Sequence, residues 1–130
     1  MALGTIASDT IQDGAGNSTA TTNCIKGSAK AWVQYCPNPN AIAGSFNVSS
    51  VTYISAGGAE VNFTTAMPNT NYAATIAVTS DGALSTCYFN GTKTQAFYTT
   101  KVCIATAYST GASTWAGSNP TAVCVSVFSS

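Results

Sequence analysis

The chain has 130 residues, a length typical of one domain, and only 6% of them are charged. An ordinary soluble domain is about 25% charged, so in this chain hydroxyl and amide side chains must make most of the polar contacts between the surface and water. The net charge is zero and arginine is absent, which argues against nucleic acid, because nucleic-acid binding depends on clustered positive charge. Low charge with 45% hydrophobic residues favours a homo-oligomer, with a monomer coated in Ser, Thr and Asn as the alternative.

The amino-terminal sequence bears on location. No apolar run approaches the roughly 18–20 residues that span a bilayer, so we expect no membrane insertion. Residues 1–9 also lack the basic segment and apolar core of a secretory signal. If the protein acts outside a cell, we therefore expect it to be released by lysis of a host.

Residues 1–27 differ in texture from residues 28–130. They are rich in Gly, Thr, Asn and Ala, and Asp13-Gly14 and Gly16-Asn17 mark turns. Their apolar content is too small for a separate core, so we expect an extended arm that packs on the domain body or on neighbouring subunits. Four isolated aliphatic residues are its candidate anchors: Leu3, Ile6, Ile11 and Ile25.

From Ala29 onward the pattern has a period of two. Ala31, Val33 and Tyr35 fall on one face of an expected strand, and Trp32, Gln34 and Cys36 fall on the other. Phe46 and Val48 continue the same alternation further along. No segment has convincing helical periodicity.

Turn signals separate the remaining strands. Pro37 and Pro39 cannot continue a strand, Gly57-Gly58 marks a hairpin, and Met67-Pro68-Asn69-Thr70 marks a turn. We expect a loop over residues 109–120. The further expected strands cover residues 51–54, 60–65, 72–79, 86–89, 95–107 and 122–128. Several short strands at this spacing predict an all-β fold, a small antiparallel β-sandwich over residues 28–130.

The five cysteines are spaced too irregularly to predict a zinc cluster or a redox dithiol. Cys103 and Cys124 lie among alternating apolar residues, so we expect them to be buried thiols. Cys24 and Cys36 could approach each other, but spacing cannot establish a disulfide. We expect neither a metal nor a cofactor.

Catalytic residues are scarce. The chain has no histidine to act as a general base for a Ser or Cys nucleophile. Of the carboxylates, Asp13 and Asp81 lie in turn dipeptides, Glu60 stands alone, and Asp9 is expected to be solvated in the arm. A pair formed by Asp9 and Asp13 across subunits stays open, but the sequence favours a protein that is not an enzyme and has no catalytic residues.

Binding residues are better supplied. Carbohydrate recognition commonly stacks an aromatic face on the sugar while Asn, Ser or Thr complete the hydrogen bonds. Aromatic and amide side chains gather at one expected turn and in the expected loop, and the ligand-binding candidates are Tyr88, Phe89, Asn90, Tyr108, Trp115 and Asn119. Phe89 and Trp115 could instead plug the end of the sandwich or a subunit interface. Trp32, Phe46, Phe63 and Tyr72 are expected in the core or an interface, and Trp32 joins the candidates for oligomer contact.

Three ordered blocks carry a family likeness. They read Gly27-Ser-Ala-Lys-Ala-Trp-Val, Ser45-Phe-Asn-Val-Ser-Ser-Val-Thr and Val61-Asn-Phe-Thr-Thr-Ala-Met-Pro-Asn-Thr-Asn-Tyr, preceded by Asp9-Thr-Ile-Gln-Asp-Gly-Ala-Gly-Asn. Over residues 8–79 the chain resembles the carboxyl-terminal module of tailed-bacteriophage tail fibres and related virion structural proteins, particularly those of cyanophages and marine phages. The region after Asp81 matches no such pattern, as expected if it varies with the target.

This resemblance implies a homotrimeric knob on the virion surface, made in the cytoplasm of a bacterial host, with other virion proteins as partners. It implies no enzymatic activity. Two functions follow from it. One is a tail fibre or fibre tip that binds a host surface glycan or protein as its receptor. The other is a capsid decoration or cement protein, a head fibre, anchored by its amino-terminal segment.

Overall fold

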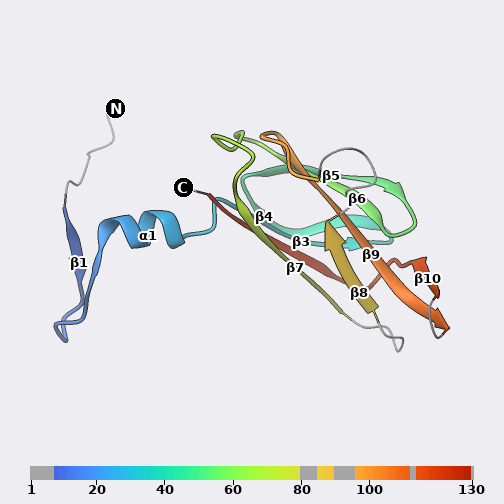
Figure 1. The fold of residues 1–130 in the computed structure, drawn as a ribbon, viewed down its shortest axis with the longest axis horizontal. Coiled ribbons are helices and arrows are strands. Elements are labelled where there is room, and N and C mark those ends of the chain that lie inside the picture. Colours follow the sequence, from blue (N-terminus) through green and yellow to red (C-terminus); the bar gives the residue numbers. More distant parts are fainter. Residues whose placement is uncertain (1–7, 80–84, 90–95, 112–113, 130) are drawn as a thin grey trace.

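The computed structural model describes residues 8–79, 85–89, 96–111 and 114–129. Residues from Ala31 onward form two antiparallel sheets packed face to face, so the predicted all-β sandwich is confirmed (Figure 1). The strands of the first sheet, in spatial order, are β4 (Asn40–Phe46), β3 (Ala31–Pro37), β11 (Val123–Phe128) and β7 (Ala73–Val78). The second sheet contains β5 (Val48–Ser55), β6 (Gly58–Phe63), β8 (Ser85–Phe89), β9 (Lys101–Gly111) and β10 (Thr114–Gly117).

The long strand β9 organises the second sheet. Ala105 pairs with both Gly58 of β6 and Tyr88 of β8, so these two strands must lie on opposite edges of β9. Ala107 likewise pairs with both Thr86 of β8 and Gly117 of β10. Strands β6 and β10 therefore follow one another along the same edge of β9, and β8 covers the other edge.

The core lies between the two sheets and follows the predicted alternation. Ala31, Val33 and Tyr35 are buried and Trp32 is exposed, so the predicted separation of these side chains onto two faces is confirmed, while Trp32 does not lie in the core of this chain. Alternate valines of β11 continue the inner face of the first sheet beside β3, with Val125 directly opposite Val33. The inner face of the second sheet is lined by Val51, Ala59, Val61, Phe63, Val102 and Ile104. Tight burial of β-branched side chains on both inner faces accounts for most of the stabilisation.

Asn47 is the corner at which the chain changes sheets. The sequence predicts one alternating strand through Phe46 and Val48, and this prediction is wrong: β4 ends at Phe46 in the first sheet and β5 begins at Val48 in the second. Asn47 has a left-handed φ of 54°, which Asn tolerates better than most residues. Alternation alone could not reveal the break, because the polar residue fits the pattern in either arrangement.

Two other strand limits differ from the sequence prediction. The expected strand 95–107 is interrupted, because the Tyr98 N–H donates to the Lys101 carbonyl oxygen (3.0 Å) and β9 begins only at Lys101. The expected loop 109–120 is wrong as well: β9 continues to Gly111, and β10 returns beside it. A hairpin between two Thr/Ser-rich segments carries little hydrophobic signal, so pattern reasoning assigned it to a loop.

The amino-terminal residues form local structure that was not expected. Strands β1 (Thr10–Gln12) and β2 (Ser18–Ala20) make a hairpin, followed by helix α1 (Thr21–Gly27). Figure 1 shows the hairpin and helix projecting from one end of the sandwich. The sequence showed no convincing helical periodicity, so neither this short helix nor the pairing of β1 with β2 was predicted. The predicted turns at Asp13 and Gly16 are confirmed, because the Asp13 carboxylate accepts from the Ala15 and Asn17 amides, each at 2.9 Å.

These contacts from Ala15 and Asn17 bear on the charge of Asp13. Hydrogen bonds from Asn17, first from its side chain, hold the pKa of Asp13 below its ordinary value, so the carboxylate stays charged.

Among the described residues, no helix is long and apolar enough to cross a membrane.

None of the five cysteines is in a disulfide. Cys124 is exposed, so the prediction that it is a buried thiol is wrong. It lies opposite Gln34 of β3 and Ala77 of β7, on the outer face of the first sheet, where alternation with Val123 and Val125 places it. Cys103 is half-buried beside Glu60, also on an outer face. The predicted alternation holds in both strands, but the two thiols lie on outer faces and not in the core, where the prediction placed them.

Candidate ligand-binding surface

The outer face of the second sheet carries two exposed aromatic side chains, Tyr88 and Trp115. Tyr88 of β8 lies opposite Ala105, and Trp115 of β10 lies opposite Ser109. Ala105 and Ser109 share the outer face of β9, since the inner face is set by Val102 and Ile104. The two aromatic residues therefore stand on the same face, on opposite edges of β9.

The spacing follows from the register. Ala105 and Ser109, the residues opposite Tyr88 and Trp115, lie four residues apart, which corresponds to about 14 Å along β9. Across the sheet, the strands β8 and β10 are separated by two strand spacings, or about 9.6 Å. The opposite neighbours of the two aromatic residues on β9, Ala105 and Ser109, are small and leave both rings uncovered among the described residues. Tyr88 is 50% exposed and Trp115 is 56% exposed. Two aromatic residues separated in this way can contact different parts of one extended ligand.

The other predicted ligand-binding residues do not join this surface. Phe89 points to the core side, where its ring lies 4.8 Å from that of Phe97, so its predicted ligand contact gives way to the alternative, a plug in the sandwich. Tyr108 is half-buried in β9, opposite Ser85 and Ala116, and not in a loop as predicted. Asn90 lies outside the described residues.

Asn119 lies beside the β5–β6 turn. Its Oδ1 accepts from the Gly57 N–H at 3.4 Å. The cavity that Asn119 lines with Tyr35 and Tyr53 has a volume of about 10 Å³, barely enough for one water molecule. Asn119 therefore supports the turn, and this cavity is too small for a sugar or a larger ligand.

One ion pair lies on the same outer face as Tyr88 and Trp115. Lys101 Nζ lies 2.7 Å from Glu60 Oε1, and this hydrogen bond raises the pKa of Lys101. The Lys101 ammonium also lies 5.3 Å from the centre of the Tyr98 ring. The two charges cancel, and β5, β6, β8, β9 and β10 carry no others. The face is therefore suited to a neutral ligand.

The predicted oligomer and anchor residues are exposed where they are described. Ile11 in β1 is 51% exposed and Ile25 in α1 is 59% exposed. Trp32 is 42% exposed and its ring lies over Gly44, because a Cβ atom on that glycine would be 3.4 Å from the ring. Leu3 and Ile6 lie outside the described residues.

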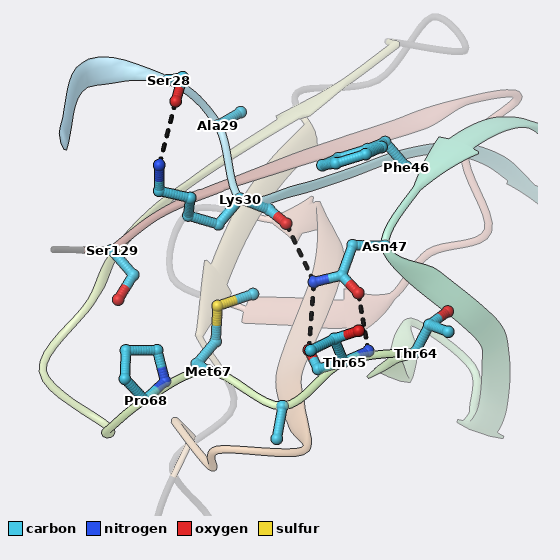
Figure 2. Close-up of a pocket in the computed structure, with 11 residues that line it drawn as sticks. Ser28, Ala29, Lys30, Phe46, Asn47, Thr64, Thr65, Met67, Pro68 and Ser129 are labelled. Carbon is cyan, nitrogen blue, oxygen red and sulfur yellow. Dashed lines mark hydrogen bonds between the residues drawn. The ribbon is translucent and has the colours of Figure 1, made fainter. Parts of the chain in front are cut away.

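A cavity that sequence reasoning missed opens at the end of the sandwich from which α1 projects. Its volume is about 600 Å³, and Figure 2 shows its wall turning from Lys30 past Phe46 and Asn47 to Met67 and Pro68. Phe46 is 56% exposed, whereas Met67 is buried and its N–H donates to the Thr99 carbonyl at 2.7 Å. We call this cavity the Phe46 pocket. The sequence signal that could have indicated this pocket is an apolar side chain, Met67, directly before Pro68 in a turn.

Asn47 builds one wall of the Phe46 pocket. Its Nδ2 donates to the carbonyl oxygens of Lys30 (3.0 Å) and Thr65 (3.1 Å), and its Oδ1 accepts from the Thr65 N–H (2.7 Å) (Figure 2). These bonds join the start of β3 to the segment after β6. Lys30 Nζ donates to Ser28 Oγ at 3.0 Å and to the Ile25 carbonyl oxygen. The wall is therefore preformed, and its polar groups have partners.

Comparisons of the chain with protein-family models, with curated proteins and with solved structures returned no match. Within the part of the chain that the structure describes, no three His, Cys, Asp or Glu side chains gather in one place.

Proposed function

We propose that this protein is a non-enzymatic structural protein of a bacteriophage virion, of the tail-fibre or fibre-tip type, which binds the host cell surface. The observation that carries the proposal is the pair of exposed aromatic side chains, Tyr88 and Trp115, on one face of a sheet whose two charges cancel. The sequence resemblance over residues 8–79 supplies the virion context. In this proposal the protein is a homotrimer on the virion surface, contacts other virion proteins, and is released by host lysis.

The chemistry of the surface favours a neutral glycan as the receptor, with a protein loop as the alternative. Aromatic rings offer large contact area at low cost in side-chain entropy, and they stack on the apolar faces of sugars. Thr86 of β8 lies two residues from Tyr88 on the same face, and Ser109 of β9 lies opposite Trp115. Their hydroxyl groups are therefore available for hydrogen bonds to a sugar. The paired charges of Glu60 and Lys101 leave no net field that selects an ion.

The test is competition with infection. Purified full-length protein is expected to bind host cells and to reduce phage adsorption. The double variant Tyr88→Ser with Trp115→Ser is expected to bind at least tenfold more weakly, since each exposed aromatic anchor contributes about 1–2 kcal/mol. Tyr53→Ser is the matched control, because Tyr53 is 46% exposed on β5 but not on this outer face. Binding by the double variant equal to that of the parent protein would refute the proposal.

The second candidate is a capsid decoration or cement protein. It is favoured by the amino-terminal hairpin and helix, whose Ile11 and Ile25 are exposed and suited to anchoring on a capsid lattice. Tail-free, emptied capsids are expected to retain the chain if this function holds, and purified tails are expected to retain it if the first holds. Imaging of labelled particles separates head from tail directly.

A further inference from the structure

The amino-terminal hairpin and helix, residues 8–27, have too little structure to be stable alone. Each strand has three residues and the helix has seven. Isolated helices shorter than about 12–15 residues and isolated two-stranded hairpins are marginal in water. Ile11 and Ile25 nevertheless remain more than half exposed. We call this segment the arm, and no surface formed by the described residues covers Ile11 and Ile25.

The arm leaves the body at the rim of the Phe46 pocket. Ser28, Ala29 and Lys30 line that pocket, and α1 ends directly before them. The Ser28 N–H donates to the Cys24 carbonyl (3.1 Å), and Ser28 Oγ donates to the Ile25 carbonyl (3.1 Å). Lys30 Nζ donates to the same Ile25 oxygen. These bonds hold the end of the helix together. The helix projects away from the sandwich (Figure 1), and Ile25 is not among the residues that line the pocket beside it.

The Phe46 pocket and its surroundings are apolar. Its apolar lining residues are Ala29, Phe46, Ala66, Met67 and Pro68, and they alternate with hydroxyl, amide and lysine side chains. The neighbouring sheet of β4, β3, β11 and β7 contains no charged residue, and Trp32 pairs directly with Phe46 on its outer face. A pocket of about 600 Å³ can accept several aliphatic side chains. It matches the exposed isoleucines of the arm in chemistry.

The charges match as well. The hairpin carries Asp9 and Asp13, and both are exposed. The end of α1 and the pocket rim carry Lys26 and Lys30. Among the described residues, the ion pair recorded joins Lys101 to Glu60, so none joins the acidic hairpin to the basic rim of the same chain. Two copies can bring these opposite charges together, which one chain does not.

We infer that the Phe46 pocket is the docking site for the arm of a second copy of this chain. Ile25 and Ile11 of one copy cover Phe46 and Met67 of the next, and Asp9 and Asp13 approach Lys26 and Lys30. Each copy gives an arm and receives one, so a reciprocal exchange can close a symmetric dimer or ring. This contact deepens the homo-oligomer part of the proposed function and does not depend on Tyr88 or Trp115.

The experiment measures self-association of the full-length protein by sedimentation velocity from about 0.1 to 100 µM, a range that brackets the micromolar affinities of weak to moderate interfaces. Ile25→Asp disables the arm, and Phe46→Asp disables the pocket. Each is expected to lower the association constant at least about tenfold, the effect of losing one buried aliphatic or aromatic contact and burying a charge. Ile54→Asp is the matched control, because Ile54 is 48% exposed on the other sheet. It is expected to associate as the parent protein does.

Mixing the two defective variants provides the sharper test. The Phe46→Asp copy still has an intact arm and the Ile25→Asp copy still has an intact pocket, so a mixed assembly regains one good contact. Association of the mixture is expected to exceed that of either variant alone. The contact is also expected to weaken between 50 mM and 500 mM salt, because part of it is electrostatic.

Three results would overturn the inference. A parent protein that stays monomeric at 100 µM excludes the second copy as occupant. Association that Ile25→Asp and Phe46→Asp leave unchanged places the contact elsewhere. Failure of the mixture to recover, with both variants melting at the temperature of the parent, excludes arm exchange. Host-cell binding by monomeric protein would leave the receptor proposal standing, so the two failures are distinguishable.

Discussion

The two sheets of the sandwich contribute equally to the core but present different outer faces. The sheet of β4, β3, β11 and β7 has no charged residue, and its exposed aromatic side chains, Trp32 and Phe46, lie side by side near the Phe46 pocket. The other sheet carries the Glu60–Lys101 pair and separates its exposed aromatic side chains, Tyr88 and Trp115, on opposite edges of β9. A clustered, uncharged face suits permanent burial against a protein, whereas separated aromatic residues suit an extended ligand. The same amino-acid types are thus arranged differently on the two faces, and we propose that one face serves assembly and the other recognition.

The largest expected effect is on the stability of the sheet that carries Tyr88 and Trp115. Gly117 lies so close to the β5–β6 turn that a Cβ atom there would be 1.9 Å from the Ala56 carbonyl oxygen. Gly117→Ala must therefore displace β10 and Trp115, and we expect a loss of about 3 kcal/mol or more in the free energy of unfolding. Chemical denaturation measures it. Gly27→Ala is the control, because a Cβ atom there meets nothing within 4 Å, and it should change stability by less than about 1 kcal/mol.

The second effect acts on the corner that joins the two sheets. Asn47→Ala removes the side-chain hydrogen bonds to Lys30 and Thr65 and leaves a non-glycine residue at a left-handed φ. We expect it to lower the free energy of unfolding by about 2–4 kcal/mol. Asn47→Gly relieves the backbone strain but not the lost hydrogen bonds, so it should lie between Asn47→Ala and the parent. Equal stability of all three proteins would show that the corner is not held by this side chain.

The third prediction concerns the loss of folding stability at high pH, to which one buried tyrosine beside each sheet contributes. Burial raises the pKa of Tyr35 in the first sheet and of Tyr72 beside the second to about 12 each. A raised folded pKa means that the stability is fully present below the unfolded value near 10 and is lost as pH rises from about 10 to 12. Thermal melts across that range should show a falling melting temperature.

Single Phe variants separate the two tyrosines. Tyr35→Phe and Tyr72→Phe should each flatten the decline in melting temperature. Tyr72→Phe should also lower stability at neutral pH by about 1 kcal/mol, because the Tyr72 hydroxyl donates to the Tyr98 and Lys101 carbonyl oxygens. A pH profile unaffected by either core variant would contradict the assignment.

The smallest effect tests the charged face. Lys101→Ala breaks the ion pair with Glu60, in which both side chains are about a quarter exposed. We expect a loss of at most about 1 kcal/mol, which shrinks as salt is added. Urea denaturation at low and high salt measures the difference. A larger, salt-independent loss would mean that the stem of Lys101 packs on Tyr98 and that charge is secondary.

Sequence reasoning succeeded where a pattern is local. Ala31, Val33 and Tyr35 were predicted to lie on the face opposite Trp32, and the structure confirms this separation, although the pattern did not say which face is buried. The Gly57-Gly58 hairpin and the Asp13 turn were also correct, because glycine and aspartate define turns through their own backbone preferences. For the candidate ligand site, Tyr88 and Trp115 were named, but so was Phe89, which the alternation of β8 turns toward the core.

The sequence by itself determined the class of fold, the strand faces and the low charge, since each depends on side-chain type and a period of two. Only the tertiary structure decided that Asn47 sends the chain into the other sheet, that β8 and β10 take opposite edges of β9, and that Phe46 and Met67 border one pocket. These features depend on which distant strands pair, and alternation specifies faces but not neighbours. Hydrogen bonds between residues far apart in sequence, such as those from Asn47 to Lys30 and Thr65, make that choice.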